Sequence, residues 1–121
     1  MTQIIAGTKT ELSIDPAILA LLPEQGSVEL QRDAAGKVHH FHTHPVDEIL
    51  MIIKGALKFE WDGGERICRP GDTILLPAGT RHQSEALDEA IYAIAMLPPA
   101  ANPASNWRDR YAGKKARSSD Q

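Results

Sequence analysis

A regular series of short strand-like segments, each ended by residues that favour turns, constrains the fold of this chain more than any other feature. Between residues 27 and 97 the segments are four to eight residues long, and glycine, proline or aspartate separates them. Such spacing is typical of an all-β sandwich or barrel. The expected strands are 27–32, 38–44, 48–54, 56–61, 65–69, 73–76, 81–86 and 90–97.

The N-terminal part of the chain follows a different pattern. Two short strands are expected around residues 2–6 and 10–14. A brief helix is expected over 17–22, with Asp15 as its N-cap and Pro16 in its first turn. The leucines of this helix are expected to pack on the core as a lid.

The composition changes again at residue 98, although a length of 121 residues suits a single domain. Residues 98–121 hold three prolines and five basic against two acidic side chains, which is typical of a flexible, solvated tail. We therefore expect a barrel domain over 1–97 and a proline-rich, basic tail over 98–121. The net charge of −3 leaves −6 on residues 1–97, and an acidic body does not favour nucleic acid as a partner.

Hydropathy and cysteine content bear on the compartment. No apolar run approaches the ~20 residues that a membrane-spanning helix needs, so we expect no membrane partner. The N-terminus lacks the basic start and long apolar core of a secretory signal. The single cysteine, Cys68, forms no internal disulfide and is expected in the core, which fits a reducing compartment. We therefore expect a cytoplasmic protein.

Four of the five histidines lie close together, between His39 and His44. Because side chains at positions i and i+2 share one face of a strand, His40, His42 and His44 are expected to point the same way and His39 to point outward. Imidazoles that converge on one space form half of a metal site. An exposed basic hairpin edge is the alternative for this stretch taken alone.

Two acids follow the histidines directly. Pro45 bends the chain, after which either Asp47 or Glu48 can return a carboxylate toward the same point. Both parities of the run 49–53 are apolar, so alternation alone does not choose between these two acids. A second stretch, 71–82, supplies the fifth histidine, His82.

Together, the two stretches resemble the paired signatures of the cupin superfamily, over residues 27–97. The first signature spaces a glycine, an HxH pair, a glutamate and a second glycine, and here these positions are Gly36, His42, His44, Glu48 and Gly55. The second signature is met by Gly71, Pro77, Gly79 and His82, while its last position holds Ala86 instead of asparagine. The spacer of fifteen residues between the two resembles that of small, single-domain bacterial cupins.

The resemblance implies a double-stranded β-helix, or jelly-roll, barrel that binds one divalent metal ion. The implied ligands are His42, His44, Glu48 and His82, which leaves Asp47 for the rim. Imidazole and carboxylate suit iron, manganese, nickel, copper or zinc. The resemblance implies a small-molecule enzyme of the dioxygenase, lyase or isomerase type, or else a ligand-binding or sensing protein without turnover.

Other side chains near the expected site have two interpretations each. His40 is a candidate for proton transfer in catalysis, or a structural histidine bonded to backbone. Tyr92 and Met96 share one face of the last strand, where they line the pocket or pack in the core. Arg81 is expected to point away from the metal, into a surface salt bridge.

The strand over 48–54 also predicts assembly. Leu50 and Ile52 lie on one of its faces and Met51 and Ile53 on the other, so both faces are apolar. Because a solvent-facing side of an antiparallel sheet is normally polar, we expect part of the outer surface to be buried in a homodimer.

Overall fold

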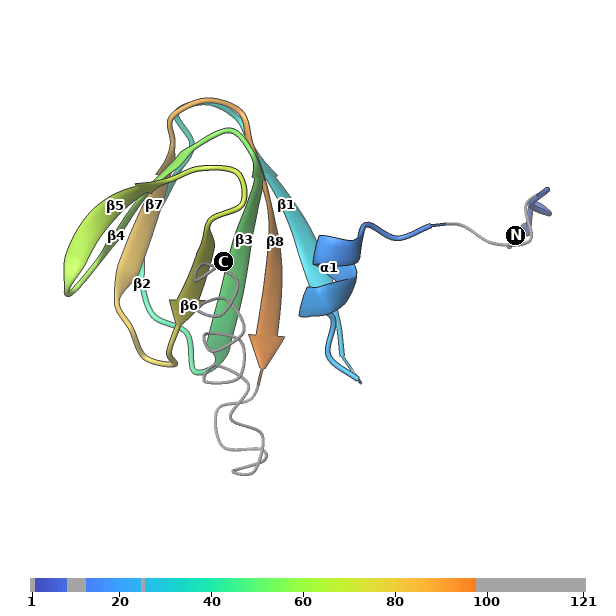
Figure 1. The fold of residues 1–121 in the computed structure, drawn as a ribbon, viewed down its shortest axis with the longest axis horizontal. Coiled ribbons are helices and arrows are strands. Elements are labelled where there is room, and N and C mark those ends of the chain that lie inside the picture. Colours follow the sequence, from blue (N-terminus) through green and yellow to red (C-terminus); the bar gives the residue numbers. More distant parts are fainter. Residues whose placement is uncertain (1, 9–12, 25, 98–121) are drawn as a thin grey trace, which may run out of the picture.

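The computed structural model describes residues 2–8, 13–24 and 26–97, and within them two four-stranded antiparallel sheets face each other (Figure 1). One sheet has the order β1-β8-β3-β6 and the other β2-β7-β4-β5. The strands are β1 (Val28–Asp33), β2 (Val38–His42), β3 (Asp47–Lys54), β4 (Leu57–Trp61), β5 (Gly64–Cys68), β6 (Thr73–Leu76), β7 (His82–Ala86) and β8 (Ala90–Leu97). This arrangement confirms the expected all-β jelly roll.

The expected strands differ from the observed ones mainly at their ends. The bounds of β6 and β8 match, whereas β2 ends at His42, two residues early. The strand expected over residues 2–6 is wrong, because this segment is exposed and pairs with neither sheet. The strand expected over 10–14 and the tail expected over 98–121 lie wholly or mainly outside the described residues.

The main core lies between the two sheets. Because side chains alternate along a strand, Leu50 and Ile52 of β3 face Leu57 and Phe59 of β4 across the barrel interior. The same cluster contains Cys68, Leu76, Ala86, Ala90 and Tyr92. Cys68 is therefore a core residue as expected, and burial raises the pKa of its thiol.

Helix α1 (Pro16–Leu21) covers part of the outer surface. Its N-cap is Asp15, whose Oδ1 accepts a hydrogen bond from the backbone N–H of Ala17 at 2.8 Å, as the sequence predicted. The helix lies against the sheet that contains β1 and β8, on the side away from the other sheet (Figure 1). There Leu21 packs with Ile49 of β3 and with two alanines of β8. Within the described residues, no helix is long and apolar enough to cross a membrane.

The two sheets are joined across one flank by a buried carboxylate. Asp33, at the end of β1, is 3% exposed and accepts hydrogen bonds from Gln31, from His39 of β2 and from Tyr92 of β8. The bond to His39 links the edge strands β1 and β2, which belong to different sheets. On the opposite flank the edge strands are β5 and β6.

Candidate metal centre

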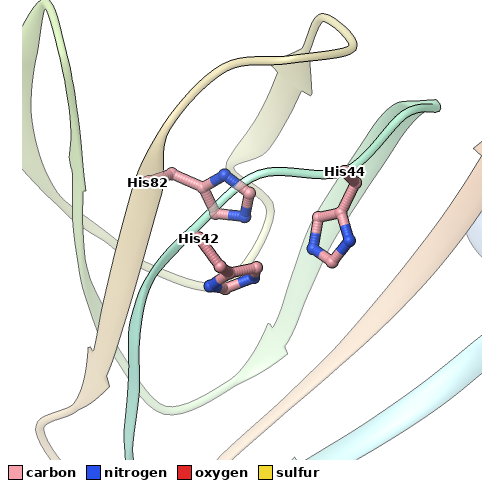
Figure 2. Close-up of side chains that lie close together, drawn as sticks. All are labelled: His42, His44 and His82. Carbon is pink, nitrogen blue, oxygen red and sulfur yellow. The ribbon is translucent and has the colours of Figure 1, made fainter.

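Three histidines from separate parts of the chain meet inside the barrel. His42 ends β2, His44 lies in the link to β3, and His82 begins β7. Their ring centroids are 4.4 to 5.3 Å apart, and one nitrogen from each ring lies within 4.8 Å of the others. Figure 2 shows the three rings grouped in one space between the β2–β3 link and the start of β7.

Backbone carbonyls fix the orientation of two of these rings. Nδ1 of His42 lies 2.5 Å from the carbonyl oxygen of His40, and Nδ1 of His82 lies 2.8 Å from that of Thr80. A carbonyl only accepts hydrogen bonds, so both Nδ1 atoms carry the proton. In the neutral form of either ring, Nε2 then keeps its lone pair and points away from the carbonyl, as a metal ligand requires.

Glu48 lies beside the three histidines. Its carboxylate Oε1 is 3.6 Å from Nε2 of His44, and the residue is 5% exposed. Burial raises the pKa of the Glu48 carboxyl, while the nearby imidazoles of His44 and His42 act in the opposite direction. A bound cation would favour the carboxylate form further.

The surroundings of His82 favour its neutral form. Burial lowers the pKa of His82, and the proximity of His42 and His44 lowers it further, against the effect of the bond to Thr80. A neutral imidazole with a free lone pair binds metal, whereas an imidazolium does not. Neighbouring nitrogens bound to one ion lie about 3.0–3.4 Å apart, since each is about 2.1 Å from the ion. The three donor atoms lie within 4.8 Å of one another, so they are grouped closely enough for one divalent ion to draw them together.

A β-bulge in β2 overturns the expected orientation of two histidines. His39 pairs with Ser84 and His42 pairs with His82, so three steps along β2 match two along β7. The extra residue reverses the alternation of side chains. His39 therefore points inward to Asp33, 3.0 Å away, and His40 is exposed.

The expectations that His40 shares the face of His42 and that His39 points outward are both wrong. The catalytic role suggested for His40 loses its geometric basis. The bulge leaves no clear sign in the sequence, because a run of histidines looks the same in either register. The sequence offered one signal for this register: Asp33, at the end of the preceding strand, is an acidic partner for a His39 that points inward.

Asp47 has a different position from the rim that the sequence suggested. It is 3% exposed, and its Oδ1 accepts a hydrogen bond from the backbone N–H of Ala78 at 2.8 Å. The backbone N–H of Gly79 donates to the carbonyl of His44 at 2.8 Å, and Gly79 has φ of 80°, which favours glycine. Asp47 and His44 thus hold the loop before His82 against the segment that carries the other ligands.

The remaining candidates lie outside the cluster. The Tyr92 hydroxyl donates to Asp33 at 2.8 Å, and burial together with this bond raises its pKa, so it stays protonated. Met96 is exposed. Arg81 points away as expected, stacking on Phe41 and lying 3.5 Å from Asp62. Ala86, at the position of the family's asparagine, is buried in the main core.

A cavity of about 610 Å³ adjoins the centre on the flank between β5 and β6. Phe59 and Trp61 of β4, together with Leu76 of β6 and Pro77 directly after it, form much of its apolar wall. The ring of Phe59 also stacks on His82, with centroids 5.6 Å apart. Phe59 therefore separates the cavity from the histidines and contacts both.

Comparison with known proteins identifies the family. Residues 29–96 match the family model for the cupin domain, so the chain belongs to the cupins. It is 33% identical over 63 residues to the dimethylsulfoniopropionate lyase DddQ of Ruegeria pomeroyi. These residues cover 51% of this chain and 31% of that protein. The chain thus spans about a third of the length of this curated relative.

Solved structures agree with the family assignment. The structure of DddQ has a TM-score of 0.51 and 31% identity, covering 55% of this chain and 34% of that one. KdgF from Halomonas has a TM-score of 0.54 and 28% identity, and the match covers 59% of this chain and 66% of KdgF. A sugar phosphate isomerase of the cupin superfamily from Silicibacter pomeroyi has a TM-score of 0.50 and 30% identity. That match covers 55% of this chain and 46% of the isomerase.

Proposed function

We propose that this chain is an enzyme that binds one divalent metal ion through His42, His44, His82 and Glu48 and acts on a small organic molecule. The observation that carries the proposal is the convergence of the three imidazoles, two of which have their Nδ1 protons held by backbone carbonyls. Metal-binding histidines commonly donate their second ring N–H to a backbone carbonyl in this way, which fixes the tautomer and the orientation of the ring. The metal is one of iron, manganese, nickel, copper or zinc.

The metal ion and the residues of the chain have different roles in the proposed reaction. A bound divalent ion supplies Lewis-acid polarisation of a substrate oxygen. The chain holds the ligands in position through the carbonyls of His40 and Thr80 and through the bond from Ala78 to Asp47. Phe59 excludes water from one side of His82, which strengthens electrostatic interactions at the centre.

Lyase or isomerase chemistry is favoured over dioxygenase chemistry within this proposal. Two of the similar proteins are, by name, a lyase and a sugar phosphate isomerase. Both reactions rearrange bonds within one substrate, and neither needs an external oxidant. The acidic balance outside the tail and the single Cys68 support a cytoplasmic protein whose partner is a small molecule rather than nucleic acid or a membrane.

A ligand-binding protein without turnover is the second candidate, and the positions of two residues favour it. The side chains that the sequence offered for proton transfer were His40 and Tyr92. His40 is exposed, and the Tyr92 hydroxyl is bonded to Asp33. A binder would keep the metal and the cavity and would release every ligand unchanged.

Metal analysis of protein purified without chelator tests the proposed centre. We expect about one equivalent of a divalent metal per chain in the wild type. His44→Ala and His82→Ala should each lose most of the metal, because each removes one of few ligands. His40→Ala is the matched control and should retain the metal, since its side chain is exposed. Full metal content in the His82→Ala protein would exclude His82 from the site.

Product formation separates the two candidate functions. The metal-loaded wild type is incubated with small carboxylic acids, sugars and phenolics, with and without dioxygen, and the mixtures are analysed for products. Turnover without dioxygen supports a lyase or isomerase, and turnover only with dioxygen supports a dioxygenase. Binding of a compound that is always recovered unchanged supports the second candidate.

A further inference from the structure

The cavity between β5 and β6 contains a cationic side chain that the metal centre does not use. Arg66 lies in the middle of β5 and lines the cavity. It pairs in register with Phe59 of β4, and it is two residues from Cys68, which is buried. Side chains two apart share a face, so Arg66 is on the inner face of its sheet.

The guanidinium of Arg66 lacks a carboxylate partner within the described part of the chain. Its sequence neighbour Glu65 is on the opposite face and lies 3.9 Å from Lys58. The acid that lines the cavity is Asp72, whose Oδ2 accepts a hydrogen bond from the backbone N–H of Arg69 at 2.9 Å. No ion pair between side chains of the described residues includes Arg66.

The surroundings of Arg66 are suited to an organic anion. The rings of Phe59 and Trp61 have centroids 6.1 Å apart and form one apolar wall, and Leu76 lies on the wall of β6. A guanidinium presents parallel N–H donors that match the two oxygens of a carboxylate. Arg66 itself is exposed, so an anion can reach it from solvent.

The cavity lies beside the metal centre, with Phe59 between the two. The sheet order places β4 between β7 and β5, so two strand spacings, about 10 Å, separate the strand of His82 from that of Arg66. Phe59 is the side chain between them, since it stacks on His82 and pairs with Arg66.

We propose that this cavity binds a small organic carboxylate, with the carboxylate paired to Arg66 and the apolar part against Phe59 and Trp61. The remainder of the ligand then lies toward His82. This last orientation rests on the proposed function, whereas binding of the anion by Arg66 does not depend on a metal.

A comparison of a charged probe with a neutral one of the same shape tests the proposal. The probes are benzoate and benzamide, and the signal is the indole N–H of Trp61 in nitrogen-15 NMR titrations. A Trp107→Phe background makes Trp61 the only tryptophan. We expect benzoate to bind about tenfold or more tightly than benzamide, because only benzoate forms a charged pair with Arg66.

Substitutions at Arg66 test whether this residue causes the preference for benzoate over benzamide. Arg66→Gln should weaken benzoate binding about tenfold and leave benzamide unchanged, and Arg66→Lys should keep part of the preference. Arg69→Gln is the matched control. Arg69 lies three residues along the chain and is exposed like Arg66, but it does not line the cavity, so the substitution removes the same charge outside the proposed site. Its benzoate affinity should stay within about twofold of the wild-type value.

Each titration is run on metal-free and on zinc-loaded protein. A preference for benzoate that depends on Arg66 in the metal-free protein supports the inference even where no metal-dependent turnover exists. Equal affinities for benzoate and benzamide, an equal loss in Arg69→Gln, or no saturable shift of the Trp61 signal at millimolar probe would overturn it.

Discussion

One extra residue in β2 decides which histidines reach the barrel interior. Without the bulge, alternation would place His40 and His42 on one face, but the observed register brings His39 and His42 inward instead. The two inward histidines then have different roles. His42 joins the metal centre, and His39 binds the carboxylate of Asp33 on the flank of the barrel.

Asp33 provides a test at the scale of a residue. Burial alone would raise the pKa of its carboxyl, but hydrogen bonds from Gln31, Tyr92 and His39 outweigh burial and hold the pKa below its ordinary value of 3.8. Because the folded-state pKa is the lower one, the ionised carboxyl stabilises the fold above pH 3.8, and this contribution disappears as the pH falls through the folded-state pKa.

We expect Asp33→Asn to lower the free energy of unfolding by about 1–3 kcal/mol at neutral pH, since the amide cannot accept all three hydrogen bonds. The difference from the wild type should shrink as the pH falls below 3.8. Urea unfolding at several pH values measures both effects. Asp62→Asn, at an exposed carboxylate paired with Arg81, is the control and should cost less than about 1 kcal/mol. A pH-independent deficit in Asp33→Asn would contradict the role of its charge.

At the scale of an element, helix α1 is a cover for the outside of a sheet rather than for the barrel opening. Only Leu21 of the helix is buried, and it completes a cluster with Ile49, Ala93 and Ala95 on the outer face of the β1-β8-β3-β6 sheet. The six-residue helix has little stability of its own, because short isolated helices are marginal in water. Its docking therefore depends largely on this one side chain.

Leu21→Ala is expected to reduce the free energy of unfolding by about 2 kcal/mol, since it removes a buried side chain and leaves its partners uncovered. Leu19→Ala, two residues earlier on an exposed side chain, should change it by about 0.5 kcal/mol or less. Chemical denaturation monitored by circular dichroism gives both values. Equal effects of the two substitutions would mean that the helix does not dock as described.

At the scale of the whole molecule, the two flanks of the barrel differ. The flank between β1 and β2 is joined by Asp33 and His39, whereas the flank between β5 and β6 holds the cavity that reaches toward the histidines. The outer surface also retains apolar side chains that α1 does not cover. Leu30 of β1 is 62% exposed, and Ile53 of β3 is 40% exposed.

Dimer formation through this outer face stays a prediction. Light scattering at micromolar concentration should give twice the chain mass of 13.2 kDa, because a dimer would bury Leu30 and its neighbours. Leu30→Glu should shift the protein to the monomer. Leu87→Glu, at a comparably exposed leucine in the β7–β8 link, should not. A wild-type protein that scatters as a monomer would contradict the predicted assembly.

Local patterns in the sequence were sufficient for the strands, the helix cap and the family. Alternation and turn residues depend on short-range backbone geometry, so β6, β8 and the Asp15 cap were found where they were predicted. The fixed spacing of His42, His44, Glu48 and His82 likewise carried the resemblance to the cupins. The strands and the cap are each encoded within a few residues, and each of the two cupin stretches is one continuous segment of the chain.

Tertiary structure alone decided where several polar side chains point. The bulge in β2 follows from pairing with β7, a strand forty residues away, so the chain around His39 and His40 did not indicate it. The burial of Asp47 likewise needed the loop at Ala78 as its partner. The cavity around Arg66 is lined by residues of β4, β5 and β6, and among the described residues β5 and β6 are the edge strands of different sheets. Such long-range pairing selects among orientations that local alternation leaves equal in energy.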